Sequence, residues 1–278
     1  MMRSLWTGAS GMTAQQLQVD TIANNLANVN THGFKRETQL FSTLLYDTIA
    51  RAEMDPANPP GRSVNLQVGM GVRPVATGRD FRQGALEMTE RTLDMAINGN
   101  AFFNVRMSHA EDPIQVIGYT RNGSFVVSPI ADDEMILSNR QGFTILDIDG
   151  EPIVLPIRLE SQIRGIDNDG VIWLMIDDEL VEHDQEIALT IFPNPQGLEA
   201  VGNNLFVVTQ GSGDPIIEQE EDDLPSRSSI ITGTLEMSNV NVANEMVSLI
   251  VSQRAFEMNA RSITTSDQML QEAVNLRR

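Results

Sequence analysis

The chain has 278 residues, which is enough for one large domain or two domains of modest size. It contains no cysteine, so disulfides and thiolate metal sites are excluded. The formal net charge of −19 argues against nucleic-acid binding, which needs clustered basic side chains. Residues 1–100 hold nine basic and nine acidic residues, whereas residues 101–250 hold six and twenty-six. The acidic excess in the middle of the chain is typical of a solvated surface.

The start of the chain, residues 1–32, predicts an amphipathic helix. Apolar residues recur every seven positions from Leu5, and further apolar positions widen this row near its end. The expected contact row consists of Leu5, Met12, Val19, Ile22, Leu26 and Val29. Gly8 and Gly11 interrupt the pattern, each at a cost of about 1 kcal/mol relative to alanine. A stop signal follows at residues 30–33, Asn-Thr-His-Gly.

Residues 33–75 predict a connecting segment. An apolar stretch at 40–49 is followed by RAEMDPANPPGRS at 51–63. Pro56, Pro59 and Pro60 forbid a helix or a central strand there, because proline lacks the backbone N–H. We therefore expect an extended, proline-rich loop over residues 46–63.

From about residue 76 to residue 232 the sequence favours β structure. Short strand-like runs lie at 125–127, 145–148, 172–176, 187–192 and 205–208. They are separated by Asn122-Gly123, Asp149-Gly150, Asp169-Gly170 and Gly202-Asn203, dipeptides typical of hairpin turns. Strands do not alternate with helices, so a parallel α/β sheet is not expected. We predict one antiparallel β domain over 76–232, with an exposed loop at 211–229 and a return linker at 233–240.

The end of the chain, residues 241–278, predicts a second long helix. Ser238, Asn239 and Asn241 are suitable N-cap residues for it. Its expected contact residues are Val242, Met246, Leu249, Phe256, Ile263 and Leu270, of which all but Met246 recur every seven residues. The companion positions hold Glu245, Ser252, Asn259 and Ser266, where a self-sufficient coiled coil would carry apolar residues. We interpret this helix as one that completes its packing only against several neighbours.

These elements predict an α+β fold. The N- and C-terminal helices, 1–32 and 241–278, pair as a coiled-coil-like antiparallel hairpin, and the β domain lies between them in the sequence.

Several stretches resemble one known family. Asn24, Asn25, Leu26, Ala27, Asn28, Gly33 and Phe34 fall in a stretch similar to the N-terminal motif of the flagellar basal-body rod and hook family. Ser238, Asn239 and Val240 open a stretch similar to its C-terminal motif. Residues 69–77, 83–86, 96–103, 119–125 and 197–206 resemble the distal rod branch of that family in particular. The resemblance covers almost the whole chain and is weakest at 104–118 and 126–190.

This resemblance implies a structural subunit that polymerises into a rigid, hollow drive shaft. The implied partners are other copies of the chain, proximal rod proteins, the hook protein, a rod-cap protein, the surrounding ring proteins and the flagellar type III export apparatus. The implied location is the periplasmic rod, reached without a cleaved signal peptide. In the distal rod branch the segment corresponding to 46–63 stiffens the tube, and a plain mobile loop is the alternative. A proximal rod or hook subunit and a surface-adhesin β domain are the competing functions.

Candidate chemistry is absent from the sequence. His32, His109 and His183 stand in unrelated contexts, and none has a second histidine four residues on. The Asp-rich stretches at 147–150 and 167–170 lack the rest of a calcium loop, so we interpret both as hairpin turns. We therefore expect no enzyme activity and no metal or other cofactor. No run of eighteen apolar residues occurs, so direct membrane insertion is not expected.

Overall fold

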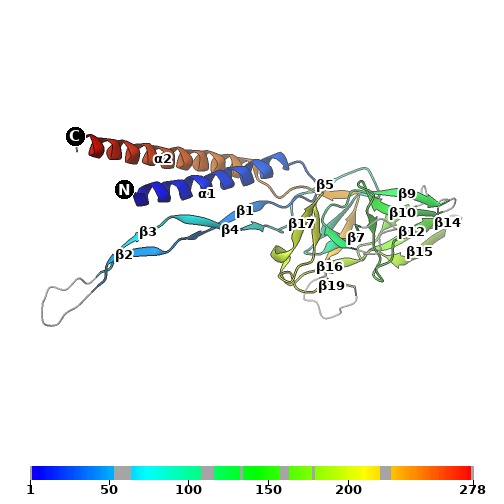
Figure 1. Cartoon of the computed structure of the whole chain (residues 1–278). Coiled ribbons are helices and arrows are strands. Elements are labelled where there is room, and N and C mark those ends of the chain that lie inside the picture. The colour runs from blue at the N-terminus through cyan, green and yellow to red at the C-terminus, as the bar shows by residue number, and fades with distance from the viewer. Residues whose placement is uncertain are drawn as a thin grey trace. The chain divides into compact units, whose positions relative to one another are not determined.

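The computed structural model describes residues 2–52, 64–107, 116–131, 134–156, 163–176, 179–219 and 227–276. The expected α+β fold is confirmed, with one long helix near each end of the chain and a mainly antiparallel β region between them in the sequence (Figure 1). Residue contacts divide the chain into two compact units. The helical unit comprises residues 1–27, 37–79 and 241–278, and the β unit comprises residues 28–36 and 80–240. That the domains expected from the sequence fold as independent units stays a prediction.

The described residues of the helical unit form two helices and four strands. The helices are α1 (Met2–Ala27) and α2 (Val242–Asn275). Figure 1 shows them side by side, with both chain ends at the same end of the pair. Asn241 caps α2, and its side chain accepts a hydrogen bond from the Asn244 N–H at 3.1 Å. Among the described residues, neither helix has the length and apolar content needed to span a bilayer.

Two antiparallel ribbons form where the sequence predicted a connecting segment. β1 (Glu37–Thr43) pairs with β4 (Val72–Arg79), and β2 (Tyr46–Ala50) pairs with β3 (Leu66–Gly69). The expectation of a loop beginning at residue 46 is therefore wrong for residues 46–50. Pairing with residues far along the chain supplies the backbone hydrogen bonds that the local sequence does not predict. The proline-rich residues 53–63 lie outside the described residues.

The β unit is built around one large antiparallel sheet. Its main path runs β12-β10-β11-β7-β8-β18-β17, with β9 beside β10 and β16 joining β7 to β19. β13, β14 and β15 form a three-stranded sheet, and the pairs β20–β6 and β21–β5 complete the unit. The strands of the β unit are β5 (Leu86–Met88), β6 (Met95–Asn98), β7 (Phe102–Arg106), β8 (Ile117–Thr120), β9 (Phe125–Ala131), β10 (Glu134–Asn139), β11 (Thr144–Ile145), β12 (Val154–Pro156), β13 (Ile163–Ile166), β14 (Val171–Ile176), β15 (Glu179–Glu186), β16 (Leu189–Ile191), β17 (Glu199–Gly202), β18 (Leu205–Val207), β19 (Ile216–Ile217), β20 (Ser229–Thr232) and β21 (Thr234–Glu236). A 3-10 turn, η2 (Pro195–Gly197), lies between β16 and β17.

Three of the four predicted hairpin turns are present. Gly150, Gly170 and Gly202 all have positive φ, which glycine adopts without steric cost. Asp169-Gly170 joins the paired strands β13 and β14, and Gly202-Asn203 joins β17 and β18. Asn122-Gly123 is not a hairpin turn, because β8 pairs with β7 and β18 while β9 pairs with β10.

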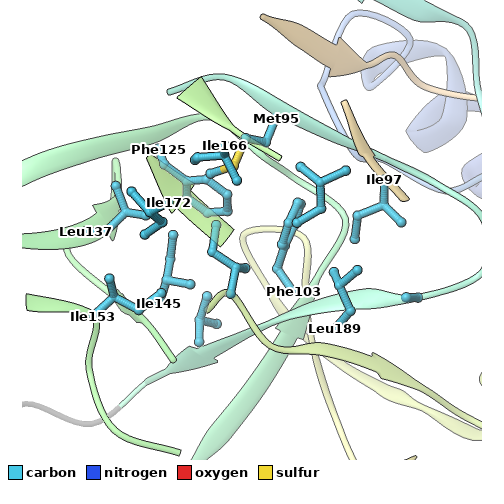
Figure 2. Close-up of a cluster of buried hydrophobic side chains, with 14 of the residues drawn as sticks. Met95, Ile97, Phe103, Phe125, Leu137, Ile145, Ile153, Ile166, Ile172 and Leu189 are labelled. Carbon is cyan, nitrogen blue, oxygen red and sulfur yellow. The ribbon is translucent and has the colours of Figure 1, made fainter. Parts of the chain in front are cut away.

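Two apolar clusters fill the β unit. The larger gathers aliphatic and aromatic side chains from β6, β7, β9, β10, β11, β13, β14 and β16, many of which Figure 2 shows converging. In the smaller cluster, Phe102, Phe192 and Phe206 meet Phe81 and Tyr119 with ring planes close to perpendicular. Edge-to-face contacts of this kind contribute about 0.5–1.5 kcal/mol per pair beyond burial.

We expect Phe103→Ala to destabilise the β unit by about 3–5 kcal/mol, because the ring is fully buried and truncation leaves a cavity. Urea unfolding of the full chain, followed by circular dichroism, measures the loss. Val201→Ala on β17 of the same sheet is the control, since its side chain is about half exposed and the change should stay within about 0.5 kcal/mol. Equal midpoints for both variants would contradict this assignment of the core.

Candidate assembly site

The contact between α1 and α2 uses small and polar residues. On α2 the buried side chains are Glu245, Ser252 and Ser266, which fall in the row that the sequence marked as poor in apolar residues. The hydroxyl oxygen of Ser4 on α1 lies 3.2 Å from the hydroxyl oxygen of Ser266 on α2. The helices therefore pair mainly through this polar row, defined as Glu245, Ser252, Asn259 and Ser266, with Leu249, Ile263 and Leu270 half-buried beside it.

Glycines allow the two helices to approach closely. A Cβ added at Gly8 would lie 2.9 Å from Cγ1 of Ile263, and one added at Gly11 would lie 2.8 Å from Nδ2 of Asn259. Both distances are shorter than ordinary carbon contacts. In the sequence these glycines are only weak points in an apolar row, but the structure shows that they provide room for the partner helix.

The side-chain amide of Asn25 links the C-terminal end of α1 to the N-terminal end of α2. Asn25 is buried, and its Oδ1 accepts a hydrogen bond from the Glu37 N–H at 2.9 Å. Its Nδ2 donates to the Glu37 carbonyl at 2.8 Å and to Oε2 of Glu245 at 3.3 Å. Arg79 on β4 pairs with the Glu37 carboxylate. Asn25 thus ties α1, β1 and the first turn of α2 together.

The apolar residues of α2 are left largely open. Of the predicted contact residues, Val242, Met246 and Phe256 are exposed, whereas Leu249, Ile263 and Leu270 are half-buried. Val247, Ile250, Val251, Met258, Met269 and Val274 add further exposed apolar surface. An exposed apolar surface of this extent is typical of an interaction face.

The predicted residues of α1 are better covered. Ile22 is fully buried, and Leu5, Met12, Val19 and Leu26 are half-buried. Val29, expected on this helix, instead lies in the turn that follows it, because α1 ends at Ala27.

In the β unit, a buried charge cluster joins distant parts of the chain. Lys35, Arg121 and Glu236 are all buried. Lys35 Nζ lies 2.6 Å from Glu236 Oε1 and donates to the Arg82 carbonyl at 2.9 Å. Arg121 Nη1 lies 3.5 Å from Glu236 Oε2, and its Nη2 donates to the Gly99 carbonyl at 2.7 Å. One carboxylate therefore serves two buried cations.

Burial lowers the pKa of Lys35, because the low-dielectric interior disfavours the charged amine, and the neighbouring Glu236 carboxylate opposes this shift. Burial likewise lowers the pKa of Arg121, again against the attraction of Glu236. At the surface nearby, hydrogen bonds from Arg82 lower the pKa of Asp80.

The residues that carried the family resemblance position this part of the chain. Asn239 Nδ2 donates to the Asp80 carbonyl at 2.7 Å and to the Arg82 carbonyl at 3.0 Å, while its Oδ1 accepts from the Arg36 N–H at 2.8 Å. Gly33 has φ +70°, and a Cβ there would lie 2.7 Å from the Asn122 nitrogen. Only glycine fits both constraints.

The remaining motif residues make local contacts. Asn24 Nδ2 donates to Glu37 Oε2 at 3.3 Å, and Asn28 Oδ1 accepts from the Thr31 hydroxyl at 3.2 Å. Ser238 Oγ accepts from the Val240 N–H at 3.3 Å. Phe34 and Val240 are buried, Leu26 is half-buried, and Ala27 is exposed.

The acidic stretches form turns. The Gly150 N–H donates to the Asp147 carbonyl at 2.9 Å, and the Gly170 N–H donates to the Asp167 carbonyl at 3.1 Å. Across the part of the chain that the structure describes, no group of three or more potential metal ligands is present. His183 contacts the Val154 carbonyl through Nε2 at 3.1 Å, His32 lies 3.7 Å from Glu87, and His109 lies outside the described residues.

Comparison with known families agrees with this arrangement. Residues 5–35 match the family described as flagella basal body rod protein, residues 96–174 match the flagellar hook protein FlgE/F/G D1 domain, and residues 231–276 match the flagellar basal body rod FlgEFG protein C-terminal. The fold and these matches define a protein of the flagellar rod and hook class.

Curated relatives narrow the class. The chain is 42% identical to the flagellar basal-body rod protein FlgG of Borreliella burgdorferi, and the alignment covers 100% of both chains. It is 40% identical to FlgG of Buchnera aphidicola from Acyrthosiphon pisum, over 99% of this chain and 100% of the relative. It is 34% identical to FlgG of Bacillus subtilis, over 100% of both. The chain therefore belongs to the FlgG family of flagellar basal-body rod proteins, which are named as structural proteins rather than enzymes.

Because Glu236 neutralises two cations, we expect Glu236→Gln to cost about 3–5 kcal/mol of stability, leaving Lys35 and Arg121 unpaired and repelling each other. Lys35→Met should cost less, since Arg121 and Glu236 remain as a neutral pair. Adding Lys35→Met to Glu236→Gln should recover part of the loss. Urea unfolding of the four proteins at pH 7 forms the double-mutant cycle, and additive costs would contradict the shared carboxylate.

The same cluster predicts a pH dependence. The lowered pKa of Lys35 means that the unfolded chain holds its proton to higher pH than the folded chain. Raising the pH through that interval therefore favours the folded state. Glu236→Gln removes the carboxylate that opposes the shift, so it should lower the pKa of Lys35 in the folded state further. The free energy of unfolding of this variant should therefore rise more steeply between pH 7 and pH 10 than that of wild type. Lys35→Met should remove the difference.

Proposed function

We propose that this chain is the structural subunit of the distal rod, which polymerises into a rigid, hollow shaft and transmits torque to the hook. The observation that carries the proposal is the pairing of α1 and α2 through the polar row, which leaves apolar residues of α2 exposed. Water-exposed apolar surface is buried when other copies pack alongside. Many such contacts around each subunit give the tube its stiffness.

The proposed partners follow from this role. Other copies pack against the helices, the proximal rod proteins and the hook protein continue the tube, and a rod-cap protein assists growth. The surrounding ring proteins face the acidic β unit. The chain reaches the periplasmic rod through the flagellar type III export apparatus.

The ribbon of β2 and β3 extends the interaction surface. Leu45, Tyr46, Ile49 and Leu66 all expose large apolar side chains. An isolated two-stranded ribbon is marginally stable in water. We assign this ribbon, with the proline-rich residues that lie between β2 and β3 in the sequence, to contacts between neighbouring subunits that stiffen the tube.

A sibling role, as a proximal rod or hook subunit, would use the same helices. One observation is consistent with it: the chain is also 30% identical to the flagellar hook-basal body complex protein FlhP of Bacillus subtilis. Imaging of basal bodies purified from cells lacking this chain separates the roles. A rod that ends short of the hook supports the distal rod. A complete rod without a hook supports a hook subunit, and loss of the proximal part of the rod supports a proximal rod subunit.

The terminal helices should be only marginally stable in the free subunit. Their mutual contact buries mostly small and polar residues, and ordering some sixty residues costs on the order of 60–120 kcal/mol of backbone entropy. Assembly supplies the missing burial, so folding is coupled to binding. Hydrogen exchange should show amides of α1 and α2 exchanging within seconds in the monomer and protected in isolated rods. Protection already present in the monomer would overturn this account.

Phe256→Asp should block rod growth without changing monomer stability. Because the terminal helices should be only marginally stable in the free chain, a carboxylate at this 39% exposed position should cost little there, whereas in the assembly it would be buried without a partner. Swimming, electron microscopy of basal bodies and the urea midpoint of the monomer measure the three effects. Gln268→Asp, at an exposed polar position of the same helix, is the control and should assemble normally. Normal rods from Phe256→Asp would contradict the proposed interface.

A further inference from the structure

An aromatic side chain stands unburied near the start of α1. Trp6 is 76% exposed, although tryptophan is among the side chains that gain most from burial. Ala9, three residues on and on the same side of the helix, is also exposed. The buried positions of α1, such as Ala14 and Ile22, lie on other faces. The rest of the chain therefore buries little of the Trp6 side chain.

A hollow lies on the same helical hairpin, between α1 and α2. Its volume is about 420 Å³, and it is lined by Gln16 and Val19 of α1 and by Gln253, Phe256 and Glu257 of α2. Val19 and Phe256 give it an apolar base. The two amides and the carboxylate offer acceptors, which suit the single N–H donor of an indole ring.

The indole of Trp6 cannot reach the hollow of its own chain. Gln16 and Val19 follow Trp6 by ten and thirteen residues, which is about 15–20 Å along the helix and about 80–140° around it. The aromatic side chain and the hollow thus lie on different faces of the hairpin. Trp6 of a second copy can fill the hollow of the first copy, while Trp6 of the first copy enters the hollow of a third.

We propose that Trp6 of one copy inserts into the hollow formed by Gln16, Val19, Gln253, Phe256 and Glu257 of the next copy. This contact joins two different surfaces, so each subunit offers both halves and the chain of contacts does not close on itself. Such heterologous contacts generate helical filaments. The inference rests on the proposed function and names a specific contact that assembly uses.

Fluorescence tests the burial of Trp6. The chain contains two tryptophans, so Trp173→Phe leaves Trp6 as the reporter. On polymerisation of this variant, Trp6 emission should shift to the blue and iodide quenching should fall at least about fivefold. Trp6→Ala should raise the critical concentration at least about tenfold, as expected for a central aromatic anchor. Trp173→Phe alone should polymerise like wild type.

Cross-linking tests where Trp6 goes. Because the chain has no cysteine, Ala9→Cys and Gln253→Cys variants each carry one thiol, the first beside Trp6 and the second at the hollow. In mixed rods a short bismaleimide should join the two variants to each other. Single-variant rods should yield few dimers. Homodimers through Ala9→Cys would instead indicate a symmetric contact and overturn the proposal.

The outcomes separate this proposal from the function on which it rests. Rods in which Trp6 stays open to iodide and no mixed cross-link forms would refute the Trp6 contact and leave the rod function intact. A chain that is absent from basal bodies altogether would refute both. Blue-shifted, protected Trp6 together with mixed cross-links would establish the contact.

Discussion

The rest of the helical unit depends on the choice of which row of α2 faces α1. Glu245, Ser252 and Ser266 are the buried residues of α2, Leu249, Ile263 and Leu270 are only half-buried, and Gly8 and Gly11 let the backbones approach. A hairpin paired through Phe256 and its neighbours would be more stable alone, but it would present a polar surface to other copies. The polar row thus trades stability of the single chain for apolar surface that an assembly can bury.

The β unit is held together in the opposite way. Its core is apolar, and two buried cations, Lys35 and Arg121, share the Glu236 carboxylate. Lys35 directly precedes the residues that lead into β1, and Glu236 ends β21 shortly before α2 begins. The ion pair between them therefore fixes two chain segments that lie about two hundred residues apart. An apolar core would hold these segments by area alone, whereas the ion pair and the Asn239 hydrogen bonds fix their register.

The sequence predicted the two helices, their cap at Asn241 and three of the hairpin turns, because each of these depends on residues close together in the chain. It also identified the family through its motifs. It did not reveal which row of α2 is buried, since a period of seven marks both rows equally. Strands β1 to β4 were missed because their partners lie up to 42 residues away and their side chains are mostly exposed. The cluster of Lys35, Arg121 and Glu236 carries no local pattern at all.

Charge is divided between the units in a way that suits assembly. The residues of the helical unit include nine basic and nine acidic side chains, so the whole net charge of −19 belongs to the β unit. Like-charged surfaces repel one another over roughly one Debye length, about 8 Å at physiological salt. Helices that pack at 8–10 Å would feel that repulsion fully if they carried the excess. With the excess on the β unit, the helical units carry no net charge and can approach one another without that repulsion.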